Sequence, residues 1–250
     1  MLTFVGLGLW DERDVSLKGL EAIKAADFVY AEFYTSQLSG TTQEKMEAVY
    51  GKKVKILRRE DIENNPKEIL ENAKKGNVVL LSGGDSMVAT THVDLRLRAK
   101  DAGIETRIIH GASISSAVIG LTGLQNYKFG KSASIAFPYK KDISEVPYET
   151  VRMNRKNGLH TLLYLDLSMT IPQALEILSE FEKRKKEKIL SGIIIGVAGA
   201  GSENPLVKAG SVEALKKFDF GKPLHTLVFT GELHFMEREA LEKFCGASRI

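Results

Sequence analysis

A turn with two glycines and an acid is the feature of this sequence best suited to binding or catalysis. Gly83-Gly84-Asp85-Ser86 follows residues 78–81, four apolar residues of which two are β-branched, as expected of a strand buried on both faces. The glycines allow a sharp turn, and Asp85 or Ser86 is a candidate cap for a helix that ends near Gly103. Open α/β sheets bind ligands at such carboxyl ends of parallel strands. This turn is therefore the first candidate for a binding site.

Asp85 also limits which ligand the turn can bind. A phosphate needs N–H groups and positive charge at a helix start, and a carboxylate there repels it. The first predicted turn, Gly6-Leu7-Gly8, lacks the third glycine of the dinucleotide fingerprint, and Asp11, Glu12 and Asp14 follow it. Both turns therefore favour a ligand that is neutral or cationic at this point. The alternative is that Asp85 only caps its helix, and the turn alone does not decide between the two.

Strand and helix patterns alternate through about the first 110 residues, which is typical of a parallel sheet with helices on both faces. Leu17, Leu20 and Ile23 mark the apolar face of the first helix, and Thr41 and Asn65 are predicted caps of the next two. The predicted strands of this half are residues 2–5, 28–30, 54–57, 78–81 and 106–109.

The segment after the fifth strand is where we place the domain junction. An apolar helix is expected from Ile114 to about Leu121, with Ser113 as its cap and N–H groups that suit a carboxylate. Residues 1–112 are then an N-terminal α/β domain, and residues 113–250 a C-terminal α/β domain. Its predicted strands are 133–137, 161–165, 193–197 and 224–229, and its predicted helices 146–157, 172–185, 212–217 and 234–245.

Composition excludes several classes of protein. A formal charge of +3 over 250 residues does not suggest nucleic acid binding, and a single cysteine excludes an internal disulfide and a cysteine metal site. None of the five histidines has the spacing of a helical zinc site, so we expect no metal, and His92 and His160 are expected to be hydrogen-bonded structural residues. With no basic leader and no apolar run of about 20 residues, the chain is expected to be soluble and cytoplasmic, without membrane contact.

The sequence also lacks any nucleophile or acid–base constellation that we could assign. Methyl transfer from an activated donor needs little from side chains, because positioning does most of the work. We therefore assign no catalytic residue.

The order of these motifs resembles that of the tetrapyrrole-methylase-like methyltransferases. The resemblance lies in residues 4–9 and 26–32 and in the Gly-Asp turn with its flanks, residues 81–91. Residues 31–36, 89–92, 127–132 and 158–163 are more specifically similar to the branch of that family that acts on translation elongation factor 2. One departure is Ser86, where the family commonly has proline, which affects the rigidity of the turn more than the chemistry.

The resemblance implies a two-domain α/β fold, with a parallel N-terminal sheet, a mixed C-terminal sheet and the ligand cleft between them. It implies a homodimer that uses S-adenosyl-L-methionine, without a metal, and releases S-adenosyl-L-homocysteine. The substrate is then elongation factor 2, methylated on the 3-amino-3-carboxypropyl arm of a histidine in diphthamide biosynthesis. Residues 32–36 and 139–142 are expected at the mouth of the cleft.

Eight donor-binding residues are implied by the same resemblance. They are Leu9, Asp85, Val88, Ser113, Ile114, Leu165, Ala200 and His225. Alternatively, the apolar ones are plain core, Ser113 is a helix cap and His225 a strand-edge histidine. The position at strand ends independently favours a binding role for Asp85 and for the Ser113–Ile114 pair.

Three other functions remain possible from the sequence. A methyltransferase for a small tetrapyrrole of the precorrin or siroheme type would share the fold, and fold alone does not exclude it. A nucleotide-binding oxidoreductase is suggested by Gly6-Leu7-Gly8. The third is a non-catalytic module that senses the methyl donor or another ligand.

Overall fold

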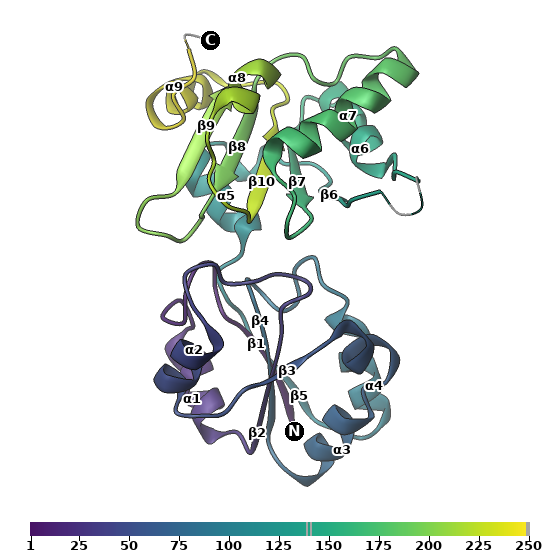
Figure 1. Ribbon diagram of the computed structural model, residues 1–250, viewed down its shortest axis with the longest axis vertical. Helices are drawn as coiled ribbons and strands as arrows, with labels where there is room; N and C mark the ends of the chain where they lie inside the picture. The colour runs from purple at the N-terminus through teal and green to yellow at the C-terminus, as the bar shows by residue number, and fades with distance from the viewer. Residues whose placement is uncertain (139, 141, 249–250) are drawn as a thin grey trace. The chain divides into compact units, whose positions relative to one another are not determined.

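The computed structural model describes residues 1–138, 140 and 142–248 (Figure 1). The chain forms two compact units, Met1–Ile114 and Ser115–Ile250, and each unit contains a five-stranded sheet. The domain boundary expected after residue 112 remains a prediction, because a domain is a segment that folds on its own.

The first unit is built on a parallel sheet with the strand order β3-β2-β4-β1-β5. The predicted strands of this half are all present, and the predicted parallel sheet is confirmed. Because every pair is parallel, the carboxyl ends of the strands lie at the same edge of the sheet. The strands are β1 (Leu2–Gly6), β2 (Phe28–Glu32), β3 (Lys55–Leu57), β4 (Val78–Ser82) and β5 (Thr106–Ile109).

Helices cover both faces of this sheet (Figure 1). Val79 and Leu81 of β4 belong to the apolar cluster that contains residues of α1 (Leu17–Ala25) and α2 (Gln43–Tyr50). The alternate residues Val78 and Leu80 join the cluster on the other face, with α3 (Lys67–Lys75) and α4 (His92–Asp101). Successive side chains of a strand point to opposite faces, which explains why β4 is a continuous apolar run. A short π-helical turn, Glu60–Asn64, precedes α3.

The predicted starts of three helices are wrong. The helix after β4 begins at His92, with Thr91 as N-cap, and not at Asp85 or Ser86. The N-cap of α2 is Thr42, whose side chain accepts the N–H of Lys45, and not Thr41. The N-cap of α3 is Pro66, since Asn65 ends the preceding π-helical turn.

The prediction that Leu17 lies on the apolar face of the first helix is also wrong. Leu17, the first residue of α1, is 80% exposed. Gly19 and Ile23 form the buried stripe of this helix, and a residue two positions before Gly19 lies roughly 200° away around the axis. Gly19 instead approaches Val5 of β1, whose Cγ1 would lie 3.0 Å from a Cβ at position 19.

The second unit is built on a mixed sheet with the strand order β6-β7-β10-β8-β9, which confirms the predicted sheet type. Only β6 and β7 are parallel, and the other neighbours are antiparallel. The strands are β6 (Ala133–Ile135), β7 (Thr161–Leu165), β8 (Ile194–Ala198), β9 (Leu206–Gly210) and β10 (His225–Phe229). The edge strand β9 was not predicted.

Five helices pack on this sheet in the described part of the chain. Leu163 and Leu227 share an apolar cluster with Ala174, Leu175 and Leu178 of the longest helix, and Figure 1 shows that helix, α7, in front of the sheet. The helices are α5 (Ile114–Thr122), α6 (Val146–Lys156), α7 (Ile171–Lys185), α8 (Val212–Lys217) and α9 (Phe235–Phe244), with a 3-10 turn at Asn126–Lys128.

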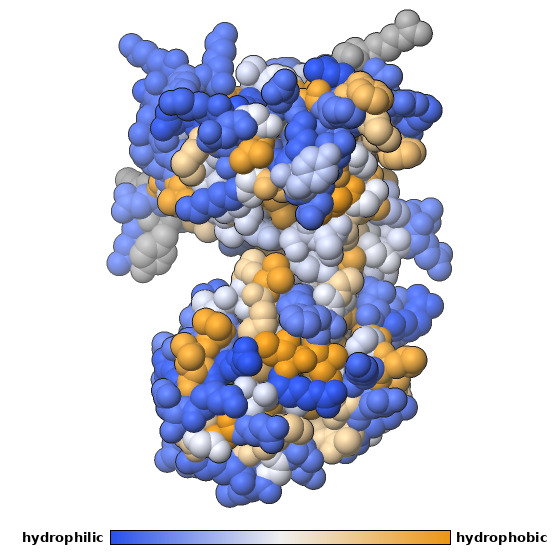
Figure 2. All heavy atoms as spheres, turned by 180° about the vertical axis from the view of Figure 1, so that it is seen from behind, coloured by the Kyte–Doolittle hydropathy of each residue, from blue (hydrophilic) through white to orange (hydrophobic). Residues whose placement is uncertain are grey.

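The face of the protein shown in Figure 2 is mainly polar. Figure 2 shows one face, on which hydrophilic residues predominate in both units and hydrophobic residues form smaller groups. Within the described residues, none of the helices combines the length and the apolar character needed to span a bilayer.

Candidate functional site

Three turns pack against one another at the carboxyl edge of the first sheet, those after β1, β4 and β5. Gly8 and Gly84 form an antiparallel bridge in which the N–H of each donates to the carbonyl of the other, at 3.2 and 2.6 Å. A Cβ at Gly111 would lie 2.5 Å from the carbonyl oxygen of Gly84 and 2.7 Å from the carbonyl carbon of Gly6. Because backbone atoms surround this position, only glycine allows so close an approach of the turns.

Asp85 links the turn after β4 to the turn after β5. Its side chain is buried, and Oδ1 accepts the N–H of Met87 at 2.8 Å. Oδ2 lies 2.8 Å from Nδ1 of His110 and accepts the N–H of Gly111 at 3.3 Å. The carboxylate therefore does not cap a helix, and it joins two turns whose strands are separated in the sheet by β1. A contact between Asp85 and a ligand remains a prediction.

His110 is the exposed partner of this buried carboxylate, with 73% of its side chain accessible. A carboxylate can only accept, so Nδ1 carries the hydrogen and Nε2 is the ring nitrogen with a lone pair. Sequence reasoning did not single out the His110–Asp85 pair. The signal that could have found it is that both residues follow strands of one predicted parallel sheet, whose carboxyl ends lie at the same edge.

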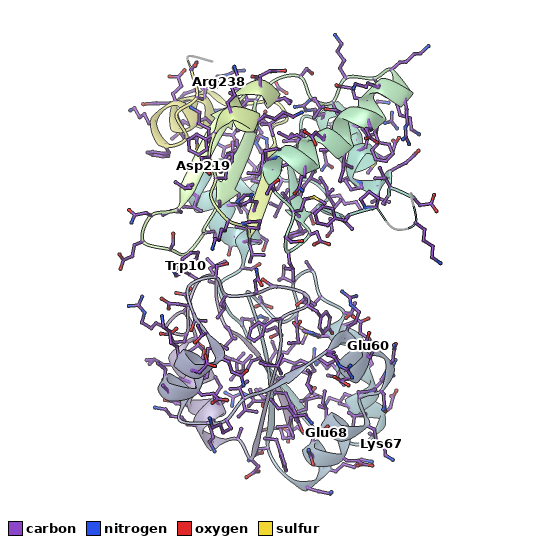
Figure 3. The ribbon with its side chains drawn as sticks, viewed as in Figure 1. Trp10, Glu60, Lys67, Glu68, Asp219 and Arg238 are labelled. Carbon is purple, nitrogen blue, oxygen red and sulfur yellow. The ribbon has the colours of Figure 1, made fainter. Side chains whose placement is uncertain are left out.

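The turn after β1 uses its own acids to satisfy its backbone. Oδ2 of Asp14 accepts the N–H groups of Leu9 at 3.1 Å and Trp10 at 2.7 Å, and Figure 3 shows Trp10 at this edge of the first unit. Asp11 pairs with Arg13 at 2.7 Å, and the hydrogen bond from the Arg13 side chain lowers the pKa of Asp11. Asp14 thus occupies the N–H groups that a pyrophosphate would use in a dinucleotide turn.

The remaining predicted residues of the first unit belong to the same turns. The N–H of Val88 donates to the carbonyl of Asp85 at 3.1 Å, and the Val88 side chain is half-exposed. Ser113 is buried and directly precedes α5, which begins at Ile114 as predicted. The structure therefore brings five predicted residues to the carboxyl edge of this sheet, namely Leu9, Asp85, Val88, Ser113 and Ile114.

Glu32, the last residue of β2, belongs to the segment 32–36 expected at the mouth of the cleft, but its side chain is buried. Glu32 has no exposed surface and accepts the N–H groups of Tyr34 at 3.1 Å and Thr35 at 3.0 Å. Nε2 of His92 lies 3.4 Å from Oε1 of Glu32, and Nδ1 of His92 lies 2.9 Å from the carbonyl oxygen of Ser86. His92 thus binds the main chain of the turn that contains Asp85, which confirms its expected structural role.

The three predicted residues of the second unit lie at one edge of its sheet. Leu165 ends β7, Ala200 follows β8 by two residues, and His225 begins β10. Because β10 is antiparallel to both neighbours, its start lies beside their ends, and His225 pairs with Ala198 in the register. The predicted strands alone did not indicate which of them pair in this unit.

The imidazole of His225 is fully used within the protein. Nδ1 accepts the N–H of Ile171 at 3.3 Å, and Nε2 lies 3.2 Å from the carbonyl oxygen of Phe220. Because Nδ1 accepts a hydrogen bond, it carries no hydrogen and the ring is neutral, and burial lowers the pKa of His225 in the same sense. A ligand at this edge could use the main chain of His225 rather than its ring nitrogens.

Two further points concern a metal site and the predicted segment 139–142. No three His, Cys, Asp or Glu side chains among the described residues are grouped as a metal site requires. Of the predicted segment 139–142, residues 139 and 141 lie outside the described residues.

The fold and these turns define a class of protein. Residues 1–215 match the family Tetrapyrrole (Corrin/Porphyrin) Methylases, and the chain belongs to this family of methyltransferases. The expected fold, family and enzyme class are confirmed.

The similar proteins carry a more particular name. The diphthine synthase of Methanocella arvoryzae is 60% identical over 253 residues, which cover 98% of each chain. The diphthine synthase of Methanosarcina mazei is 60% identical over 254 residues, covering 97% of this chain and 95% of that protein. A crystal structure of diphthine synthase superposes with a TM-score of 0.92 at 49% identity, covering 99% of this chain and 96% of the other. The branch of the family recognised from residues 31–36, 89–92, 127–132 and 158–163 is therefore confirmed.

Proposed function

We propose that this protein has the activity of a diphthine synthase. It transfers methyl groups from S-adenosyl-L-methionine to the 3-amino-3-carboxypropyl arm of a histidine in translation elongation factor 2. Full-length identity of 60% to relatives of that name carries the proposal. These relatives do not support the alternative, a methyltransferase for a small tetrapyrrole.

The turns of the first unit fit a donor without phosphate. Asp14 occupies the N–H groups of Leu9 and Trp10, and Asp85 adds a second carboxylate at the same edge. S-adenosyl-L-methionine carries a sulfonium and an ammonium and no phosphate, so these acids favour it. When bound, it supplies a methyl group that is already activated for transfer, which leaves positioning to the protein.

We propose that the eight predicted residues hold this donor. In the first unit, the first N–H groups of α5 suit its carboxylate, next to Ser113 and Ile114, and the acid of Asp85 suits a cationic group. Leu9 and Val88 offer apolar surface and main chain in the adjoining turns. In the second unit, Leu165 and Ala200 contribute surface at the sheet edge, and His225 contributes its main chain because both ring nitrogens are engaged.

Labelling of the protein substrate tests this function. Elongation factor 2 purified from cells that lack this enzyme should carry the unmethylated arm. Incubated with this protein and radiolabelled donor, it should gain label on that histidine alone, and a factor with alanine at the histidine should gain none. Label on a tetrapyrrole precursor, with none on the factor, would contradict the proposal.

Ligand-dependent melting tests the choice of donor separately. A ligand at one hundred times its dissociation constant adds about 2.7 kcal/mol to the free energy of unfolding, so the donor or its demethylated product should raise the melting temperature by several degrees. NAD and ATP should have little effect, because each brings phosphates against Asp14 and Asp85. A larger shift with NAD would favour the oxidoreductase alternative.

We also propose that the protein is a homodimer, on the strength of the family resemblance. Sedimentation equilibrium at micromolar concentration should then give twice the mass of one chain. A single-chain mass at that concentration would contradict it.

A further inference from the structure

We propose that His110 is the proton acceptor for the amine that is methylated. The inference rests on the proposed function and adds a residue to it. His110 stands at the carboxyl edge of the first sheet with its ring 73% exposed, next to the turns that carry five of the proposed donor-binding residues. Its inner nitrogen, Nδ1, is 2.8 Å from the buried carboxylate of Asp85.

The carboxylate that holds His110 is itself held rigidly. Oδ1 of Asp85 accepts the N–H of Met87, and Oδ2 accepts the N–H of Gly111 in addition to the bond from His110. A carboxylate fixed in this way orients the imidazole and sets its tautomer, with hydrogen on Nδ1 and the lone pair on Nε2. The lone pair is thus presented at the exposed side of the ring.

The other four histidines are engaged elsewhere. His92 and His160 are fully buried, and both ring nitrogens of His225 bind the protein. His234 is the N-cap of α9, where its side chain accepts the N–H of Met236. Among the described histidines, His110 combines an exposed ring with a place beside the proposed donor-binding turns.

The chemistry needs such a group. The amino group of the arm lies beside a carboxylate, so its pKa is above the value of about 7.7–8.0 for the α-amino terminus of a chain. Near neutral pH almost all of the arm is therefore an ammonium ion without a lone pair. Its N–H bond breaks as the proton moves to Nε2 of His110, and the nitrogen keeps the electron pair. That pair forms the new C–N bond while the methyl–sulfur bond breaks with its electrons on sulfur. The exposed ring then returns the proton to solvent.

The charged surroundings of His110 are limited. Asp85, from the turn after β4, is the charged residue that contacts its ring among the described residues. The turn after β1 packs against the same edge, and its charged residues are Asp11, Glu12, Arg13 and Asp14. Asp11 pairs with Arg13, and Asp14 binds backbone N–H groups.

The variant His110→Asn separates proton transfer from positioning. Its amide N–H can still donate to Asp85, but it has no basic nitrogen. In single-turnover methylation of elongation factor 2 with saturating donor, the rate at pH 7 should fall about 100-fold or more. The ratio of the wild-type rate to the variant rate should be smaller by about tenfold or more at pH ~9.5, because much of the arm is then already a free amine. His234→Asn is the matched control, because Asn still caps α9, and it should keep wild-type rates at each pH.

Two readouts do not depend on turnover. Calorimetry should show that His110→Asn binds the donor within about twofold of wild type. Nitrogen-15 spectra of the histidine side chains should show His110, identified by its loss in the variant, with hydrogen on Nδ1 in its neutral form.

Either of two kinetic results would overturn the inference, namely a wild-type rate for His110→Asn at pH 7, or a loss of equal size at every pH, which a structural role would give. A neutral His110 with hydrogen on Nε2 would also overturn it. A wild-type protein that labels no elongation factor 2 would contradict the proposed function instead, and the spectra would still decide which nitrogen of His110 is basic.

Discussion

Nε2 of His160 lies 2.9 Å from Oε1 of Glu237, and neither side chain is exposed to solvent. Oε1 also accepts the N–H of Gln125 at 2.9 Å. Oε2 accepts the N–H of His234 at 2.8 Å and a hydrogen bond from Nζ of Lys128 at 2.9 Å. Four donors therefore meet on one carboxylate near the start of α9, and those from Gln125, Lys128 and His160 connect this helix to two other segments of the second unit.

Glu237→Gln should destabilise the second unit by about 3 kcal/mol, as expected when one partner of a buried ion pair is removed. The new amide would place N–H groups against donors such as Lys128, and the charge would be lost. Chemical denaturation followed by circular dichroism measures the effect.

The matched control for this variant is Glu239→Gln on the same helix. Glu239 forms an exposed pair with Lys243, so its loss should change the free energy of unfolding by less than about 1 kcal/mol. Equal losses for the two variants would show that the buried network does not stabilise the unit.

The same network should make the protein sensitive to acid. Burial alone would raise the pKa of Glu237, but hydrogen bonds from Gln125, His234, Lys128 and His160 lower it to about 2. Burial lowers the pKa of His160 below its ordinary 6.5. The unfolded chain therefore binds more protons than the folded protein, and the free energy of unfolding should fall as the pH drops below 6.5 and again from 4.5 towards 2.

Denaturation midpoints measured between pH 8 and pH 3 test this dependence. In Glu237→Gln, the part of the decline that begins near pH 4.5 should be smaller, because the shifted carboxyl is gone. A variant profile parallel to that of wild type over this range would contradict the assignment to Glu237.

The strands of the first unit were predictable because their signal is local. Each residue of β4 is buried, so the run of apolar residues in the sequence directly reflects burial on both faces. The strand β9 has no such signal, since it is an edge strand that contains Lys208 and whose first residue, Leu206, is 39% exposed.

The place of the candidate residues at the sheet edge could be predicted, but not the contacts of their side chains. Carboxyl ends of parallel strands meet at one edge, and this rule placed Asp85 and Ser113 correctly. Sequence patterns describe bonds to near neighbours, and so the turn alone offers two roles for Asp85, a helix cap or a contact to a ligand. Its partner His110 is 25 residues away, and Glu32 and His92 are even farther apart in the sequence. No local pattern encodes such pairs.

Asp85→Asn should weaken both the fold and the donor site. Asparagine has a single acceptor oxygen, so the N–H groups of Met87, His110 and Gly111 cannot all be satisfied, at a cost of about 2 kcal/mol. If the charge of Asp85 also attracts the donor, calorimetry should show weaker binding, with the larger loss at low salt.

Asp94→Asn is the control for that variant. Asp94 forms an exposed pair with Arg98 on α4, and its loss should change neither stability nor donor affinity appreciably. Donor affinity that is unchanged in Asp85→Asn at low and high salt would leave Asp85 with a structural role only.

Gly111→Ala should strongly destabilise the first unit. The added Cβ would meet the backbone of Gly84 and Gly6 at 2.5 to 2.7 Å, and backbone on both sides cannot yield as a side chain would, so we expect a loss of about 3 kcal/mol. Trp10 is the only tryptophan and lies in the turn after β1, so its fluorescence reports unfolding of this unit.

Gly120→Ala is the matched control, since a Cβ there has nothing within 4 Å and alanine should stabilise α5 by up to about 1 kcal/mol. A Gly111→Ala protein as stable as wild type would show that the three turns can separate without cost.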